Sequence, residues 1–304
     1  MEEFEEMLAA ARNAMPGNIR IAGQGTDQER YQTIPGMSRV AGINGSMSLR
    51  QMLPQLPGTE GRTYNIPAGS TVSMEVFLLN RSRVVQAGAR LIPITLPPTP
   101  DNAPAGSFYA RPGSFTLLEP GNFVAADDAT PVMAQSLPVQ EAPIDLGQMR
   151  TRAVRFDISR REQKGLSDSE LSARIMTSII HGLANIVDQE LLDEIGAAGP
   201  LATFSLSEAA TSGVRFNELR ALVGTAGAGA QVENGRLYVS GIPAELTAET
   251  ASTFVGSFDR SAIAVMDDLR LIVERKGANG RLLVTCWVDL LPLLPDDTYF
   301  WVVN

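Results

Sequence analysis

The stretch SDSELSARIMTSIIHGLANIVDQELLDEIG (167–196) decides the fold. Ser167 and Glu170 have the spacing of a capping box, which begins a helix, and Gly196 supplies a stop signal. A helix of about 30 residues would be roughly 40 Å long, a length typical of a structural strut. The apolar residues that recur with the helical period are Leu171, Ile175, Met176, Ile179, Ile180, Leu183, Ile186, Val187, Leu191, Leu192 and Ile195.

The segment before this helix has the alternation of a β-strand. In residues 149–159 the apolar Val154, Phe156 and Ile158 alternate with Arg155 and Asp157. The segment after the helix predicts a mixture of short elements ending in strands. The expected elements are a helix over 216–223, a glycine-rich loop over 224–230, a buried strand over 235–240, a short helix over 244–250, strands within 261–268, 269–275, 281–294 and 298–303, and a hairpin turn at 276–280.

The first half of the chain is less regular. Residues 2–14 predict a short amphipathic helix with an acidic start, and residues 15–45 have the composition of an extended arm. A helical turn is expected at 48–56, and strands at 63–66 and 72–79. Ten of the 19 prolines fall between residues 91 and 143, which excludes a helix or a central strand there. Because residues 108–124 are rich in aromatic and aliphatic side chains, we expect an ordered excursion rather than a linker.

Composition excludes several functional classes. The net charge is −9, which argues against a protein that grips nucleic acid through a basic surface. Cys286 is the single cysteine and His181 the single histidine, so an intrachain disulfide and a Cys/His zinc site are excluded. His181 falls within the predicted long helix, which disfavours nucleophilic triads. The sequence has neither a secretory signal nor an apolar run of about 20 residues, so we expect a soluble intracellular product.

Two patterns that can hold ligands have simpler structural interpretations. The stretch GTAGAG (224–229) lacks the lysine and hydroxyl residue of a phosphate-binding loop, so a flexible loop is favoured. The acid pairs Asp127-Asp128, Asp267-Asp268 and Asp296-Asp297 resemble turn residues beside strands, with no third acid at ligand spacing. We therefore expect no cofactor, no metal and no catalytic residue.

A basic run precedes the long helix. Its six positive charges face two acids, and Phe156 is the only aromatic residue within it, so stacking on bases is disfavoured. We favour pairing with acids of a neighbouring chain, and a solvated strand face remains the alternative. The candidate inter-subunit contacts are Arg150, Arg152, Arg155, Arg160 and Arg161, and Lys164 completes the run.

Four stretches, taken in order, resemble the major capsid protein of a tailed bacteriophage, which has the Hong Kong 97-type fold. SMSLRQMLPQL (46–56) resembles the segment before the family's extended loop. VRFDISRREQKGLSDSELSARIMTSIIHGLANIVDQELLDEIGAAG (154–199) resembles the strand and long spine helix. GRLYVSGIPAEL (235–246) resembles the central strand and helix of the axial domain, and GSFDRSAIAVMDDLRLIVER (256–275) resembles the strand that returns to the peripheral domain.

The resemblance implies an α+β fold with an N-terminal arm, an extended loop, a peripheral domain with the spine helix, and an axial domain. The implied divisions are an arm at 1–45, the first part of the peripheral domain at 46–63, an extended loop with a possible inserted subdomain at 64–155, the peripheral domain with its spine helix at 156–199, the axial domain at 200–255 and return strands at 256–304.

The resemblance also implies a function and partners. Copies of the chain would assemble as pentamers and hexamers into an icosahedral head shell around double-stranded DNA, which an acidic subunit would contact only weakly. Because residues 64–155 contain no lysine, we expect no lysine–asparagine cross-link and a non-covalent shell. No long helical leader precedes the arm, so a separate scaffolding protein is expected, with a portal and decoration proteins as further partners.

The implied location is the virion head, with the host cytoplasm during assembly, and no membrane is involved. The chain is then not an enzyme. One alternative is the shell of an encapsulin-like compartment, which encloses cargo enzymes instead of a genome. The other is a soluble enzyme with a site near Gly227, which would lack the usual His, Cys and Lys groups.

Overall fold

The computed structural model of the 304-residue chain describes residues 45–48, 78, 81–94, 113–124, 133–266, 268–276 and 280–304. The helices are α6 (Arg83–Gln86), α7 (Arg160–Lys164), α8 (Asp168–Ala197) and α9 (Leu206–Thr211), with 3-10 turns at Leu146–Gln148, Phe216–Glu218 and Phe258–Arg260. The strands are β1 (Gly45–Ser48), β2 (Arg90–Ile94), β3 (Ser114–Leu118), β4 (Val139–Pro143), β5 (Arg150–Ile158), β6 (Arg220–Val223), β7 (Ala230–Glu233), β8 (Arg236–Val239), β9 (Ile242–Leu246), β10 (Thr253–Gly256), β11 (Ala262–Met266), β12 (Asp268–Lys276), β13 (Arg281–Leu293) and β14 (Phe300–Val303).

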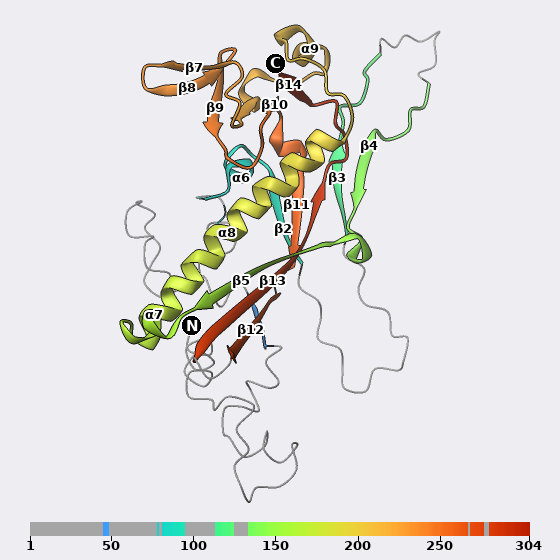
Figure 1. Ribbon diagram of the computed structural model, residues 1–304. Helices are drawn as coiled ribbons and strands as arrows, with labels where there is room; N and C mark the ends of the chain where they lie inside the picture. The colour runs from blue at the N-terminus through green and yellow to red at the C-terminus, as the bar shows by residue number, and fades with distance from the viewer. Residues whose placement is uncertain are drawn as a thin grey trace, which may run out of the picture.

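A long helix lying across a sheet of long strands forms the main body (Figure 1). The sheet runs in the order β1-β12-β13-β11-β2, and β5 also pairs antiparallel with β13 from Leu282↔Ile158 to Leu290↔Arg150. One stripe of α8 is buried, and it includes Met176, Ile180 and Leu191. This stripe and the buried strand residues form one large core, so burial of the apolar stripe fixes the helix on the sheet.

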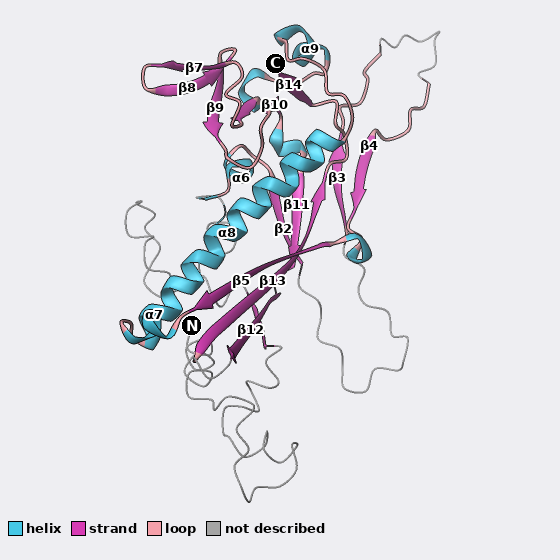
Figure 2. Ribbon diagram, viewed as in Figure 1, coloured by secondary structure: helices cyan, strands magenta, loops and turns pink. Residues whose placement is uncertain are grey.

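The second sheet lies at the C-terminal end of α8 (Figure 2). Its order is β14-β10-β6-β9-β8-β7. Phe300 on β14 contacts Phe258 edge to face, with ring centroids 5.3 Å apart, and both side chains are buried. Since β14 follows β13 directly, the last strands of the chain connect the two sheets.

The third sheet is the hairpin β3–β4, and it packs on the main body through a small core of its own. Phe115 and Leu117 alternate with exposed residues along β3 and point inward. They contact buried side chains of β11 and β13, such as Ala264 and Leu293. The proline-rich excursion is therefore anchored where the structure describes it, as its apolar content predicts.

Several sequence-based expectations are confirmed. The long helix begins after Ser167, whose hydroxyl accepts from the backbone N–H of Glu170 while the Glu170 carboxylate accepts from Ser167 in a capping box. The strand over 149–159 is β5, and β12 and β13 pair as a hairpin. The expected elements at 2–14 and 63–66, and most of those at 15–45, 48–56, 72–79 and 276–280, lie outside the described residues.

Two expected helices are wrong. Residues 216–223 form a 3-10 turn followed by β6, a strand with neighbours on both sides, in which Ala221, Leu222 and Val223 are buried. The apolar pattern of a short, fully buried strand is the same as that of a buried helical turn. Periodicity therefore cannot distinguish a strand from a helix in so short a segment. Residues 242–246 form β9, in which Pro243 is the second residue and precedes the pairing with β6, which begins at Ala244. The strand at 235–240 is confirmed as β8, although most of it is not buried.

Candidate assembly surfaces

The first two arginines of the basic run bind acids of α8. Arg150 Nη1 donates to Glu190 Oε2 at 2.9 Å, and its other terminal nitrogen pairs with Glu194. Arg152 Nε donates to the second oxygen of Glu190. Burial alone would raise the pKa of Glu190, but the hydrogen bonds from both arginines outweigh it and lower that pKa. These two arginines therefore tie β5 to α8 within one subunit.

We expect Glu190→Gln to destabilise the subunit by about 2 kcal/mol at pH 7, because a buried acceptor of two charged donors is neutralised. The folded-state pKa of Glu190 lies below its unfolded value, so its contribution is present above the unfolded pKa and is lost as pH falls through the folded one. The difference in unfolding free energy between wild type and variant, measured in urea, should shrink below about pH 4.3.

A matched control is Glu274→Gln, which removes an acid on β12 that pairs with Arg155, another arginine of the run. Glu274 lies 3.7 Å from Arg155 and both side chains are more than half exposed, so little effect on stability is expected. A Glu190→Gln variant as stable as this control would contradict the role given to Glu190.

The remaining arginines of the run are directed towards solvent. Arg160 and Arg161 are exposed on α7, and neither forms an ion pair with an acid in the part of the chain that the structure describes. The run is thus split between intrachain pairs at its start and exposed charges at its end. Contact between this run and a neighbouring subunit stays a prediction.

A buried acid that sequence analysis missed also lies on α8. Asp188 Oδ1 accepts from Ser82 Oγ at 2.5 Å and from the backbone N–H of Val84 at 3.0 Å, and Oδ2 accepts from the N–H of Arg83 at 2.9 Å. Burial raises the pKa of Asp188, although these hydrogen bonds act to lower it. The helical period could have revealed it, because Asp188 falls on the apolar face between Val187 and Leu191.

Polar contacts hold the hairpin β3–β4 against the main body. Arg260 pairs with Glu119 at 2.8 Å, just after β3, and its guanidinium lies 3.9 Å from the centroid of the Tyr299 ring. On the other strand, Gln140 Nε2 donates to Asp296 Oδ2 at 2.7 Å. The orientation of the hairpin is therefore fixed by its own subunit.

The far end of this hairpin exposes apolar side chains. Leu118 and Val139 are cross-strand partners on its outer face, and the Gln135 side chain donates to the Asn122 carbonyl beyond them. Phe123 is fully exposed and Met133 is 81% exposed. We call this surface the hairpin tip, and its apolar members are Leu118, Phe123, Val124, Met133, Leu137 and Val139. Apolar side chains gathered on a projecting element are typical of a protein–protein contact.

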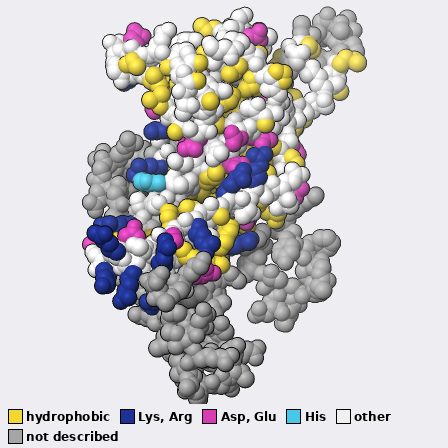
Figure 3. Space-filling model, in the orientation of Figure 1, with side chains coloured by type: hydrophobic (Ala, Val, Ile, Leu, Met, Phe, Trp, Pro, Cys, Tyr) yellow, Lys and Arg dark blue, Asp and Glu magenta, His cyan; other side chains and the backbone are white. Residues whose placement is uncertain are grey.

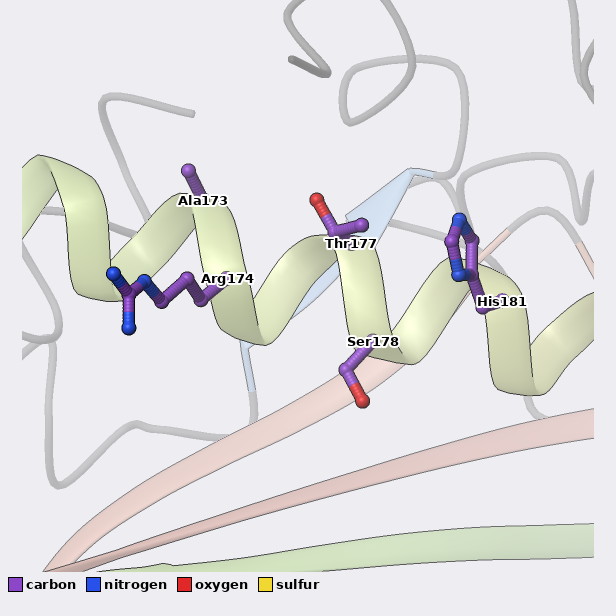
Figure 4. Close-up of a pocket in the computed structure, with 5 residues that line it drawn as sticks. All are labelled: Ala173, Arg174, Thr177, Ser178 and His181. Atoms are coloured by element: carbon purple, nitrogen blue, oxygen red, sulfur yellow. The ribbon is translucent and has the colours of Figure 1, made fainter. Parts of the chain in front are cut away.

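The structure also places the other residues considered for chemistry: the histidine, the glycine-rich loop and one of the acid pairs. His181 lies mid-way along α8 beside a hollow of about 400 Å³, where Thr177 and His181 point one way and Arg174 and Ser178 the other (Figure 4). Burial lowers the pKa of His181, and nearby Arg81 adds to this effect. Gly224 begins the glycine-rich loop, which leaves β6 and not a helix. Asp296 accepts from the Thr298 N–H in a turn, as expected.

Among the described residues, no group of three or more His, Cys, Asp or Glu side chains could hold a metal ion. The side chains of Asp127, Asp128, Asp267 and Asp268 lie outside the description. No described helix is both long and apolar enough to cross a membrane.

Comparison with solved structures identifies the fold. A chain of the satellite phage P4 procapsid, a particle that includes the size determination (Sid) protein, has a TM-score of 0.52 and 12% identity, over 80% of this chain and 92% of that one. The capsid of the native GTA particle scores 0.44 with 14% identity, over 79% and 93%. The virus-like particle from Pyrococcus furiosus scores 0.43 with 10% identity, over 75% and 94%.

Neither a scan against protein-family models nor a search of curated proteins finds a match. The likeness to the P4 procapsid chain shows that this chain has a phage capsid fold, and the expected α+β class agrees with the helices and three sheets of the described residues.

Proposed function

We propose that the protein is the major capsid protein of a tailed bacteriophage, a structural subunit without catalytic function. The fold shared with the P4 procapsid chain over most of both chains carries this proposal. The hairpin tip supports it, because a rigidly held element with exposed apolar residues suits contact with other subunits.

The finer architecture belongs to the same proposal. Residues 1–45 would be the N-terminal arm, 46–63 and 156–199 the peripheral domain, 64–155 the extended loop, 200–255 the axial domain and 256–304 the return strands. Pentamers and hexamers of the chain would close an icosahedral head around double-stranded DNA. The shell would be non-covalent, since no lysine occurs in residues 64–155.

The proposed partners follow from that role. A separate scaffolding protein, a portal and decoration proteins would join the shell, which would contact DNA weakly because each subunit is acidic overall. Assembly would take place in the host cytoplasm and the mature product would be the virion head. The second candidate is the shell of an encapsulin-like compartment, which would enclose cargo enzymes instead of a genome.

Negative-stain electron microscopy of the full chain, expressed with and without a phage scaffolding protein, tests the proposal. Closed shells several hundred ångströms across are expected, with DNA inside heads purified from phage-infected cells. Shells that enclose protein cargo and no genome would favour the compartment. A compact monomer under all conditions would overturn both.

The hairpin tip gives a specific prediction. Phe123→Asp combined with Leu137→Asp should lower the yield of closed shells at least tenfold, because charges would have to be buried in a contact between subunits. Subunit stability should change little, since both side chains are exposed. Sucrose-gradient sedimentation measures the yield, and Val232→Asp on β7 is the control at another exposed apolar position. Normal shell yield from the double variant would remove the hairpin tip from the contact.

A further inference from the structure

A basic surface lies at the start of the long helix. We define the α7 patch as Arg160, Arg161 and Lys164 on α7, with Arg174 on α8. All four side chains are exposed, and none of them forms an ion pair with a described residue. Dark blue side chains gather at this end of the molecule (Figure 3). Exposed cations that form no ion pair with a described side chain can bind a separate acidic group.

The acids closest to the patch in sequence are already engaged. Glu162 accepts from both the N–H and the hydroxyl of Ser159, and Glu170 accepts in the same way from Ser167. Asp157 pairs with Arg281. These carboxylates stay negative and interrupt the row of cations, and Phe156 is the only aromatic residue in the run for bases to stack on. A short acidic peptide, which can place its few charges on the cations alone, therefore fits better than a continuous phosphate backbone.

The chain carries an acidic segment that fits. Its first six residues contain Glu2, Glu3, Glu5 and Glu6 and no basic side chain. Opposite charges on two parts of one sequence favour contact between copies when those copies are held at high local concentration in an assembly.

The segment can reach another subunit. Gly45, the first residue of β1, pairs with Leu271 on β12, and 44 residues precede it. These 44 residues can span at most roughly 145 Å when fully extended. The α7 patch is at the same end of the sheet as the β12–β13 turn, because Gln163 Nε2 donates to the Gly280 carbonyl at 2.9 Å.

We propose that the α7 patch of one subunit binds the acidic segment Glu2–Glu6 of a second copy of the chain. The inference rests on the proposed function, because a shell is what brings the second copy within reach. It deepens that function by naming both sides of one contact between subunits.

Peptide binding tests the chemistry independently of assembly. The receptor is the full chain with Glu2, Glu3, Glu5 and Glu6 all changed to Gln, so that its own segment does not compete. A fluorescent peptide of residues 1–14 should bind, and its affinity should fall about tenfold between 50 and 500 mM salt, because salt screens about four charge pairs. Arg160→Glu/Arg161→Glu/Lys164→Glu in the receptor should abolish binding.

The controls separate charge from position. A receptor with Arg215→Glu/Arg236→Glu changes exposed arginines far along the chain and should bind normally. A peptide with glutamine at the four glutamate positions should not bind. Failure of the wild-type peptide to bind overturns the inference, and so does patch-dependent binding of a labelled DNA duplex in its place. Shells that still form in either case would leave the proposed function intact.

Cross-linking of assembled wild-type particles identifies which copy supplies the segment. Lys164 is one of two lysines in the chain, and a water-soluble carbodiimide joins its amine to a glutamate carboxylate with loss of water. Particles assembled from equal amounts of isotopically heavy and light subunits should give mixed heavy–light cross-links between Lys164 and residues 2–6. Only matched pairs, all heavy or all light, would assign the contact to a single chain and refute binding of a second copy.

Discussion

Gly224→Ala should destabilise the subunit by about 3 kcal/mol or more, enough to move most of the expressed chain into the insoluble fraction. A Cβ at this position would lie 2.4 Å from the Ser252 carbonyl oxygen and 2.6 Å from that of Thr250. Both are backbone atoms, so no side-chain rotation relieves the overlap. The measurement is the soluble yield and the urea midpoint of the soluble fraction.

Gly182→Ala is the matched control. Gly182 is exposed within α8, and nothing lies within 4 Å of a Cβ built there. Alanine is the better helix former by about 1 kcal/mol, so this change should raise the urea midpoint. If Gly224→Ala instead behaved like Gly182→Ala, the close approach of residues 250–252 to β6 would be refuted.

The predicted structure and the observed one differ at the glycine-rich loop for a clear reason. The composition of residues 224–230 predicts a flexible loop, yet the N–H groups of Thr225 and Ala226 donate to the carbonyls of Thr250 and Ala251. Gly224 is thus a close-packing residue. Its partners are about 26 residues away in the sequence, and no local pattern gives their position.

The elements predicted correctly are those in which the apolar pattern repeats over many residues. The apolar stripe of α8 repeats over 30 residues and is bounded by a capping box, so helix length and buried face both follow from it. β5 alternates over nine residues and is also correct. The wrong elements, at 216–223 and 244–250, are short runs in which the neighbouring strands decide the conformation.

The partners of the basic run were also beyond what a local sequence pattern can predict. The sequence indicates that Arg150 and Arg152 belong to a basic run that needs acids, but the acids proved to be Glu190 and Glu194 on the same subunit. The charge pattern predicts that the arginines need acidic partners. It does not predict which acids these are, because the pairing depends on how β5 lies against α8. The exposed end of the run, at Arg160 and Arg161, is where an external partner still fits.

Asp188→Ala should be the most damaging change of a charged residue on α8, costing about 3 kcal/mol at pH 7. The substitution leaves the Ser82 hydroxyl and two backbone N–H groups without their acceptor in a buried position. It also frees the start of α6 from the long helix, so two segments more than 100 residues apart lose their connection. Urea unfolding of the subunit measures the loss.

Two further substitutions make this result specific. Asp188→Asn keeps an oxygen for Ser82 and Val84 and loses only the acceptor for Arg83, so it should cost about 1 kcal/mol. Asp193→Ala, at an exposed position of the same helix, should have almost no effect. Equal losses for Asp188→Ala and Asp193→Ala would contradict the connection.

The pH dependence of Asp188 should have the opposite sign to that of Glu190. Burial raises the folded-state pKa of Asp188 above its unfolded value, so the native state binds the proton more tightly. The stability of wild type relative to Asp188→Asn should therefore increase as pH falls through the folded pKa towards about 3.9. The contribution of Glu190 decreases in acid, because its arginine partners lower its pKa. Two carboxylates two residues apart on one helix thus respond to acid in opposite directions, since one is held by neutral donors and the other by cations.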